Sequence, residues 1–519
     1  MKLDLIYLKQ NLASKWSALN NGDCALSNTE DVDLLKVLIV NALRLYSLSR
    51  AHTAKIHEKA MHPGDHACLV AVDALLTLGP LIAKVNTSTL QALCLLDVVL
   101  TDNKHNFLAR TQLAGLLQTF NLYALASQAY QALDVKEILH ETMSPLLFLR
   151  IGAMHAPTLK GFNSYDAMTK ALEFYSKSLE KIPDYQSVAL DHANYSQVIH
   201  MHQFREQLSL SPTRLMLLYE RKRLARLLHD QIPGLNNKLE EPELADQLRN
   251  AYTGSAELPK RAQPDRHPGP PLTKQYNEWL MVVDLAFELA RSKQPTKIDV
   301  ETSLHTFTRL SKLINERGID QALTETELST MRAAEAIFSI ILYLVDIAIP
   351  TDMLDVNIAL ETLQAIITSL LEKYSPTPRN QLNVLPHWTD YHGAYLSLEL
   401  CQVLDALMTK LQKAKPNPTT SNASSKIISE SAKSIKTQAQ AIFDQVQRQF
   451  SSYKKDISGY GNADLLQLVM GGDAGETEDV VAEAVYEVMG VQNVRRFLQS
   501  YVSSAKVAVD AVLSVKLKK

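Results

Sequence analysis

Apolar residues recur along this chain with the period of the α-helix. Leu113, Leu116, Leu117 and Phe120 fall at i, i+3, i+4 and i+7, which places them on one face of a helix. A longer stripe near the C-terminus has the same spacing and consists of Val494, Phe497, Leu498, Tyr501, Ala505, Ala508 and Val512. No segment shows convincing alternation of apolar and polar residues, as a half-buried strand would. The pattern therefore predicts an all-α protein.

Helix start signals agree with the apolar period. Thr324 and Glu327 have the spacing of a capping box before Leu328–Ala348. Ser211 and Pro212 place a capping residue and a first-turn proline ahead of another helix. The remaining predicted helices are Asp65–Leu78, Ser88–Thr101, Leu272–Ser292, Val300–Ile314, Met353–Tyr374, His387–Gln412 and Ile427–Lys455.

Residues 105–139 have the pattern of one helix-turn-helix repeat of tetratricopeptide type. The positions that match are Leu113, Ala114, Leu117, a turn at Asn121, Tyr123, Ala126, Tyr130 and Leu133. A second, partial repeat covers Tyr165–Pro183, with matches at Ala171, Tyr175, Ser178 and the exit proline Pro183. One such helix pair cannot bury its apolar face alone, so more pairs must stack beside it. We expect a tetratricopeptide-like α-solenoid, curved and right-handed, that acts as a scaffold.

Two polar breaks interrupt the helical pattern. Residues 252–273 are rich in proline and are predicted to form a mobile linker or surface loop. Residues 413–425 have few apolar side chains and are predicted to be disordered. We therefore expect tetratricopeptide-like repeats in residues 1–251 and a C-terminal helical domain in residues 274–519.

Composition narrows the class of protein further. The 519 residues include 53 basic and 56 acidic ones, so no global field attracts nucleic acid or an anionic membrane. Asp4 interrupts the apolar run at Met1–Lys9, which argues against a secretory signal. The most apolar window, Ala336–Ile349, is too short to span a bilayer. Reduced thiols in a cytoplasmic protein are expected from four cysteines without paired spacing, Cys24, Cys68, Cys94 and Cys401.

Few side chains have the spacing of a chemical site. The nearest approach to a metal site is the trio His62, His66 and Cys68. Pro63 and Gly64 lie between these residues, and Asp65 more naturally caps the helix that begins there, so we prefer a loop followed by a packed helix. His200 and His202 are two residues apart and would point to different sides of a helix. The sequence therefore predicts no catalytic, cofactor-binding or metal-binding residue.

One basic cluster calls for interpretation, and it consists of Arg214, Arg221, Lys222, Arg223 and Arg226. We expect these long side chains to cover a packed helix with their charged ends in water. The alternative is a contact of Arg214 and Arg221, which share a helix face, with an acidic partner surface or with ribosomal RNA phosphates. Tyr123 and Tyr130 are assigned to the core.

The stretch from about Gly64 to Ile151 resembles a known family. It contains GDHACLVAVDALLTL and then NLYALASQAYQALDVKEILHETMSPLLFLRI, which continues past the generic repeat consensus. These runs resemble the auxiliary, non-catalytic subunit of the NatB N-terminal acetyltransferase, in a fungal-type version. The match weakens through Phe162–Leu228, and beyond it the likeness is one of general helical character.

This resemblance implies a defined partner. That partner would be a small acetyltransferase of the GNAT fold, which binds acetyl-CoA and acetylates nascent chains that begin Met-Asp, Met-Glu, Met-Asn or Met-Gln. The auxiliary chain would position this enzyme and link it to the ribosome. The sequence agrees with such a division, because it lacks the Q/R-x-x-G-x-G/A loop that holds CoA in GNAT enzymes, and the glycine cluster at Val469 has the wrong spacing.

Three alternatives remain open at the level of sequence. Family members are usually longer, with more repeats before the matched region, so we expect a truncated gene model, a fragment or a short paralogue. The chain is alternatively a helical scaffold of another complex, such as a NatA-type auxiliary subunit or a trafficking or proteasome-lid component. An enzyme that uses the region of His62, His66 and Cys68 is the third reading.

Overall fold

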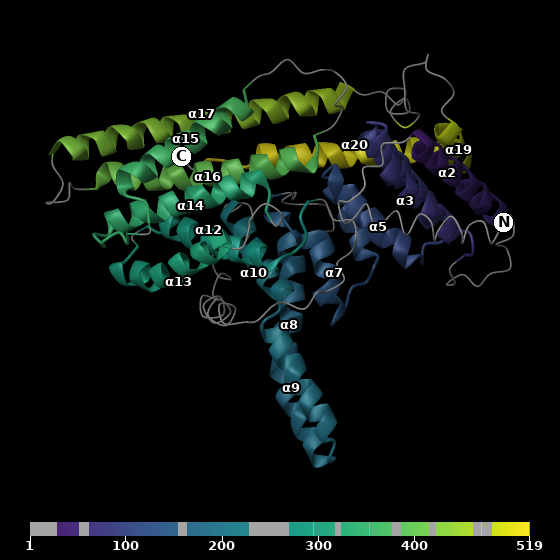
Figure 1. Cartoon of the computed structure of the whole chain (residues 1–519), viewed down its shortest axis with the longest axis horizontal. Coiled ribbons are helices and arrows are strands. Elements are labelled where there is room, and N and C mark those ends of the chain that lie inside the picture. The colour runs from purple at the N-terminus through teal and green to yellow at the C-terminus, as the bar shows by residue number, and fades with distance from the viewer. Residues whose placement is uncertain are drawn as a thin grey trace. The chain divides into compact units, whose positions relative to one another are not determined.

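The structure of the chain is a computed structural model, shown in Figure 1. It describes residues 29–50, 62–153, 163–227, 269–293, 295–316, 323–351, 353–375, 386–414, 422–459, 469 and 480–517. Within these ranges the regular structure is helical and contains no β-strand, which confirms the predicted all-α class. The chain divides into two compact units: residues 1–113 with 460–501, and residues 114–459 with 502–519.

Unit 1 is built from helices that pack in sequence order, with one helix from the distant C-terminal part of the chain. Helix α2 packs on α3, α3 packs on α4, and α19 packs on both α2 and α4. Their bounds are α2 Thr29–Arg50, α3 Asp65–Leu81, α4 Val85–Asp102 and α19 Val480–Met489. Arg50, the last residue of α2, joins this helix to α4 and α19, because its guanidinium pairs with Asp102 and also donates to the carbonyl of Val488.

Unit 2 holds most of the helices. Its N-terminal part comprises α6 Tyr123–Gln131, α7 Leu139–Phe148, the 3-10 turn η2 Ile151–Ala153, α8 Ser164–Asp191, α9 Tyr195–Ser209 and α10 Pro212–Leu227. Its C-terminal part comprises α12 Lys274–Arg291, α13 Lys297–Glu316, α14 Glu325–Leu344, α15 Val356–Lys373, α16 Trp388–Lys413 and α17 Asn422–Gly459. Helix α10 packs on α12, and α16 packs on α12, α14 and α17. The division between the units falls within α5 Phe107–Thr119 and α20 Val491–Ser514.

The predicted repeat at residues 105–139 forms a helix-turn-helix. Helices α5 and α6 are joined by a turn in which Asn121 has a φ of 52°, a conformation that asparagine adopts more readily than most residues. Its apolar positions are buried, including Ala114 and Ala126, which are both 0% exposed. Leu133 differs, because it is only half-buried beyond the end of α6.

The second repeat departs from its prediction at its end. Ala171 and Tyr175 are buried as expected, but Pro183 does not end the helix. Helix α8 continues through this proline to Asp191. The prediction that the helix ends at Pro183 is wrong. A proline ring disturbs the preceding turn of a helix, but the turns that follow it can still form.

Most other helix predictions are confirmed to within a few residues. The capping box at Thr324 is present, with its hydroxyl accepting from the backbone N–H of Glu327. The C-terminal stripe is buried along α20, with every predicted member at most 6% exposed. The prediction of disorder over residues 413–425 is wrong in part, because Lys413 ends α16 and Asn422 already begins α17. Residues 415–421 lie outside the described residues.

The predicted domain division at residues 252–273 does not match the observed units. Helices α10 and α12, on either side of this segment, pack directly on each other in unit 2. The described end of the segment is also packed, because Gly269 has a φ of 83° and a Cβ there would lie 2.5 Å from the Trp388 ring. Residues 252–268 lie outside the described residues, as do Met1–Lys9, Cys24 and most of the glycine cluster that follows Val469.

A search of the described helices for one long and apolar enough to cross a membrane finds none.

Candidate functional site

Unit 2 contains a large group of charged side chains in its interior, which we call the ionic centre. Its members come from η2, α10, α12, α14 and α16 or lie next to them, and nearly all are fully buried: Arg150, Glu220, Lys222, Arg223, Arg226, Asp284, Glu327, His392 and Glu399. Burial of a charge is costly unless it is paired and hydrogen-bonded, so the pairing of each member decides whether this arrangement is stable.

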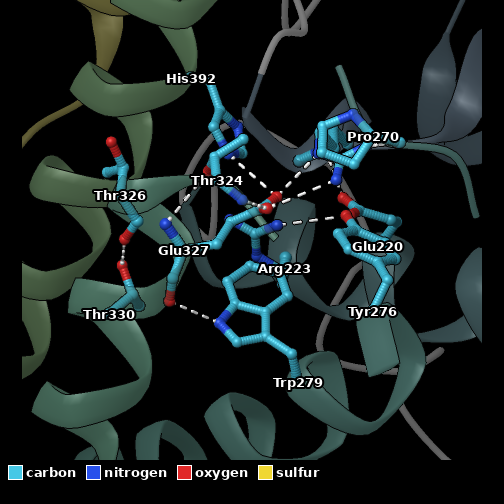
Figure 2. A network of polar contacts seen from close by, with 12 residues as sticks. Glu220, Arg223, Pro270, Tyr276, Trp279, Thr324, Thr326, Glu327, Thr330 and His392 are labelled. Carbon is cyan, nitrogen blue, oxygen red and sulfur yellow. Dashed lines mark hydrogen bonds and ion pairs between the residues drawn. The ribbon is translucent and has the colours of Figure 1, made fainter. Parts of the chain in front are cut away.

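Glu327 occupies one end of the ionic centre (Figure 2). Its Oε1 lies 2.8 Å from Arg150 Nε and 3.1 Å from His392 Nε2. Its Oε2 accepts from the backbone N–H of Thr324, and its carbonyl accepts from Trp279 Nε1 at 2.8 Å. Burial alone would raise the pKa of Glu327, but the Arg150 guanidinium and then His392 hold it well below its usual range.

Arg150 is held in place by other contacts besides its ion pair with the Glu327 carboxylate. Its Nη1 donates to the carbonyl of Pro270 at 2.6 Å, and its guanidinium lies 4.6 Å from the centre of the Tyr276 ring. The backbone of Arg150 has a φ of 62°, in the left-handed region that is unfavourable for a long side chain. Such a backbone persists only where the surroundings fix it, and here the buried ion pair with Glu327 does so.

Arg223 occupies the middle of the ionic centre. Its Nη1 lies 3.3 Å from Glu220 Oε1, and its Nη2 lies 3.2 Å from Glu399 Oε2. Its guanidinium also lies 5.3 Å from the centre of the Trp279 ring. Glu220 in turn accepts from the Tyr276 hydroxyl and from the backbone N–H of Gly152. Arg223 thus links α10, α12 and α16.

Arg226 and Lys222 occupy the other end. Arg226 pairs with Asp284, and its Nε donates to Glu399 Oε1 at 3.1 Å. Lys222 Nζ lies 3.1 Å from Asp284 Oδ2 and 3.2 Å from Glu288, a carboxylate at the half-exposed rim. Burial would lower the pKa of Lys222, but these two carboxylates raise it above its usual range.

The fully enclosed charges of the ionic centre balance when His392 is neutral, and Glu288 at the rim adds one further carboxylate beside Lys222 and Arg226. Four cations, Arg150, Lys222, Arg223 and Arg226, face four carboxylates, Glu220, Asp284, Glu327 and Glu399. Burial lowers the pKa of His392, although Glu327 opposes this shift. Its Nδ1 also has no hydrogen-bond partner among the described residues. Burial thus favours neutral His392 despite the nearby Glu327 carboxylate, and the ionic centre as a whole holds helices together.

The expected role of the basic cluster is corrected by this geometry. The charged ends of Arg223 and Arg226 do not lie in water, since their side chains are 0% and 8% exposed. The helix period placed them away from Arg214 and Arg221 but did not show that α12, α14 and α16 supply carboxylates to that face. Asp284 and Glu399 interrupt apolar runs of the sequence, and this was the signal that could have revealed buried charges.

Arg214 and Arg221, the two candidates for an anionic contact, lie in different surroundings. Arg214 is only 5% exposed. Arg221 is half-buried, with its guanidinium 5.7 Å from the centre of the Tyr165 ring and 3.4 Å from the Thr169 hydroxyl. Contact of either arginine with an anionic partner stays a prediction.

Among the described residues, no three His, Cys, Asp or Glu side chains come together as metal ligands. His66 is exposed, whereas Cys68 is buried inside α3. Burial raises the pKa of the Cys68 thiol. The described cysteines Cys68, Cys94 and Cys401 are free thiols.

A second feature of unit 2 is a helical arm, defined as residues 176–209, where α9 folds back along the end of α8 (Figure 1). Within the arm only Ile182, Ala189 and Leu208 are buried. Five large apolar side chains are at least half exposed, namely Tyr185, Val188, Leu190, Tyr195 and Ile199. His200 and His202 are exposed here as well. Exposed apolar residues in this number are typical of a surface that contacts another protein.

Comparison with known proteins identifies a family for the N-terminal half. Residues 10–266 match the family described as the N-acetyltransferase B complex (NatB) non-catalytic subunit. The chain is also 26% identical, over 134 residues, to the N-terminal acetyltransferase B complex subunit arm1 of Schizosaccharomyces pombe. That alignment covers 26% of this chain and 16% of the relative.

Solved structures extend the likeness in fold. A chain of the NatB acetyltransferase complex bound to CoA and MES matches 87% of this chain with a TM-score of 0.54 and 13% identity. A second NatB complex, bound to a bisubstrate inhibitor, matches with a TM-score of 0.53. The chain covers 53% and 54% of those two chains, about half their length. The chain belongs to the family of the non-catalytic subunit of the N-acetyltransferase B complex.

Proposed function

We propose that this chain binds and positions a GNAT-fold catalytic subunit, which acetylates nascent chains that begin Met-Asp, Met-Glu, Met-Asn or Met-Gln. Acetyl-CoA binds to that partner in this proposal, and the complex works in the cytoplasm beside the ribosome. The observation that carries the proposal is the family match over residues 10–266. The lack of a Q/R-x-x-G-x-G/A loop in the sequence supports the same division of labour.

The interior of unit 2 suits a positioning role. A scaffold raises the activity of an enzyme by holding its substrate-binding loops in one arrangement, so that less ordering is required when the peptide arrives. Such a scaffold must not yield when the partner binds. The paired charges of Arg223 and Glu399 have defined directions, so they oppose sliding between α10 and α16 more specifically than apolar contacts do.

The arm is the first surface on which to seek the partner. Tyr195 and Ile199 are 66% and 57% exposed, and both are spaced to lie on one face of α9. Interfaces are enriched in tyrosine, which supplies contact area at a low cost in conformational entropy. Contact of the catalytic subunit with these side chains would bury them.

The experiment is co-expression of this chain with the NatB catalytic subunit of the same organism, followed by size exclusion and an acetylation assay. We expect a complex that acetylates Met-Asp and Met-Glu peptides faster than the catalytic subunit alone, and no activity from this chain alone. A version extended at the N-terminus with family sequence serves as a control. Binding by the extended version only would show that this chain is an inactive fragment. Failure of both would reject the proposal, and acetylation by the isolated chain would reject the scaffold role.

A further inference from the structure

Unit 1 contains a cavity of about 270 Å³ that is lined by the end of α2, the start of α3 and the end of α4. Its wall includes Ser49, His62, Gly64 and Asp65. The space depends on the missing side chain of Gly64, because a Cβ there would lie 2.5 Å from Ser49 Cβ. Liquid water occupies about 30 Å³ per molecule, so the cavity has room for several waters or for one small molecule.

Asp65 brings a buried charge to this cavity. The residue is 0% exposed. Its Oδ2 accepts from Asn103 Nδ2 at 2.9 Å, from Asn106 Nδ2 at 3.0 Å and from the backbone N–H of His62 at 3.2 Å. Its Oδ1 has no hydrogen-bond partner among the described residues. A buried carboxylate oxygen without a partner is costly, so this atom is the one that a ligand would satisfy.

The ionic centre shows how the same protein treats other buried carboxylates. Glu327 and Glu399 are also 0% exposed, and they lie 2.8 Å from Arg150 and 3.2 Å from Arg223. Within the described part of the chain, no Lys, Arg or His side chain forms an ion pair with Asp65. The N-terminus of α3 offsets part of the charge of Asp65 but donates nothing to Oδ1. Asp65 therefore lacks the cation that comparable carboxylates have.

The other charges of the cavity are already paired. Asp102 lies 2.8 Å from Arg50 Nε and also accepts from Arg50 Nη2 at 3.0 Å and from the Tyr46 hydroxyl at 2.8 Å. This pair is neutral as a whole, so the net charge of the cavity is that of Asp65. The Ser49 hydroxyl and the His62 ring form no hydrogen bond with another described residue. Both are neutral acceptors beside the carboxylate when the His62 ring is unprotonated.

We propose that this cavity binds a primary ammonium group, whose charge pairs with Asp65 and whose N–H groups donate to Asp65 Oδ1, Ser49 Oγ and a ring nitrogen of neutral His62. An ammonium group carries one positive charge and three donors, which matches one carboxylate oxygen and two neutral acceptors. A divalent metal ion is disfavoured, because no three His, Cys, Asp or Glu side chains of the described residues come together as ligands. Two sources supply the chemistry: a free small amine and a lysine side chain of another protein.

The test measures binding of methylammonium to the full chain by saturation-transfer NMR, read on the methyl protons. Tetramethylammonium has the same charge but no N–H group, and it is expected to give no signal at equal ionic strength. Asp65→Asn keeps the shape of the side chain and should weaken binding by about tenfold or more, as expected for loss of a charge-assisted hydrogen bond. Asp33→Asn, at a side chain of α2 that is 74% exposed, is the matched control and should bind like the parent.

Three results would overturn the proposal. Equal signals from methylammonium and tetramethylammonium would show that no N–H group is recognised. Undiminished binding by Asp65→Asn would show that its charge is not required. The absence of any methylammonium signal in the parent would show that the cavity holds water only.

A second variant keeps the test decisive if Asp65→Asn does not fold, since Asp65 also accepts three structural hydrogen bonds. Ser49→Ala removes one proposed acceptor without removing a hydrogen bond between described residues, and it should also weaken methylammonium binding. Ser47→Ala, at an exposed site of α2, is its control. Equal affinity of the two serine variants would overturn the proposal.

Competition with a peptide distinguishes the two sources of the ammonium group. The probe is N-acetyl-Ala-Lys-Ala amide, which carries a lysine side chain as its only amine. Displacement of methylammonium by this peptide would support the proposal with a protein lysine as the ligand. Methylammonium binding that the peptide does not reduce would support it with a free small amine as the ligand.

Discussion

The ionic centre and the arm belong to the same unit, and α8 runs from the body of that unit into the arm. Its first half carries Tyr165, Met168, Ala171 and Tyr175, all at most 4% exposed, against the body of unit 2. Its second half carries Tyr185, Val188 and Leu190, all more than half exposed. The ionic centre hides charges from water, whereas the arm exposes apolar groups to it. Charged side chains are usually exposed and large apolar ones usually buried, and each of these two regions departs from one half of this rule.

This difference separates structural from interaction roles. A buried charge that keeps its partner specifies which helices lie together, and it is costly to disturb. An exposed apolar residue contributes little to folding, so its presence calls for another explanation, such as a partner. Ion pairs show the same contrast: Arg150 and Glu327 are 0% exposed, whereas Lys177 and Glu173 on α8 are 67% and 53% exposed.

The largest expected effect comes from breaking the ionic centre at its middle. Arg223→Leu leaves Glu399 and Glu220 short of a buried cation and should destabilise unit 2 by about 3–5 kcal/mol. The measurement is the urea midpoint followed by circular dichroism. Lys177→Ala is the matched control, since an exposed helical pair contributes only about 0.3–0.5 kcal/mol. Equal midpoints for the two variants would show that the buried pairing of Arg223 is not required.

A smaller effect is expected from the helix-turn-helix repeat at residues 105–139. It is buried like the ionic centre, but it packs through apolar side chains and not through charges. Ala126→Leu adds volume to a residue that is 0% exposed and should cost about 1–3 kcal/mol. Ala132→Leu, an exposed site just after α6, is the control. The readout is the melting temperature of the two variants. An Ala126 variant that melts with the parent would mean that the close helix packing is absent.

A pH experiment examines the charge balance of the ionic centre. Because burial lowers the pKa of His392, the folded chain holds this histidine neutral. Its contribution to stability is complete above the ordinary value of about 6.5 and declines as the pH falls below it. The urea midpoint should thus fall between pH 7.5 and pH 5.5, and less so in His392→Gln. The pKa of Glu327 is lowered, so protonation of this carboxylate would reduce stability only at a pH below this window.

The control for the pH experiment is His202→Gln, because His202 is an exposed residue of the arm. Its pH profile should follow the parent. A His392→Gln profile that also follows the parent would show that the acid sensitivity arises elsewhere.

The smallest effect on stability is expected in the arm. Tyr195→Glu should change the melting temperature little, since exposed substitutions typically stay within about 0.5 kcal/mol. It should nevertheless weaken co-purification with the NatB catalytic subunit, if the arm is its contact. Ser187→Glu adds the same charge at another exposed position of the arm and serves as control. Undiminished binding by the Tyr195 variant would exclude this part of the arm from the interface.

Glu327 illustrates how far local sequence reaches. Its spacing from Thr324 was enough to predict the capping box, because both partners lie within one helical turn. The same side chain also pairs with Arg150 and His392, which lie 177 and 65 residues away along the chain. Nothing within a helical turn of Glu327 indicates either contact. The pairing of α10 with α12 was missed for the same reason, because it depends on packing between helices that are distant in the sequence.

The sequence by itself determined the helical class, most helix bounds, the tetratricopeptide-like repeat and the family resemblance. These depend on spacing within a few turns, which the apolar period and the capping residues record directly. Only the tertiary structure decided that Arg223 and Arg226 are buried and that the arm residues are exposed. Whether a side chain meets water or a carboxylate depends on which distant helices pack around it. This packing involves contacts between residues that are far apart in the sequence, so the local pattern around one residue does not specify it.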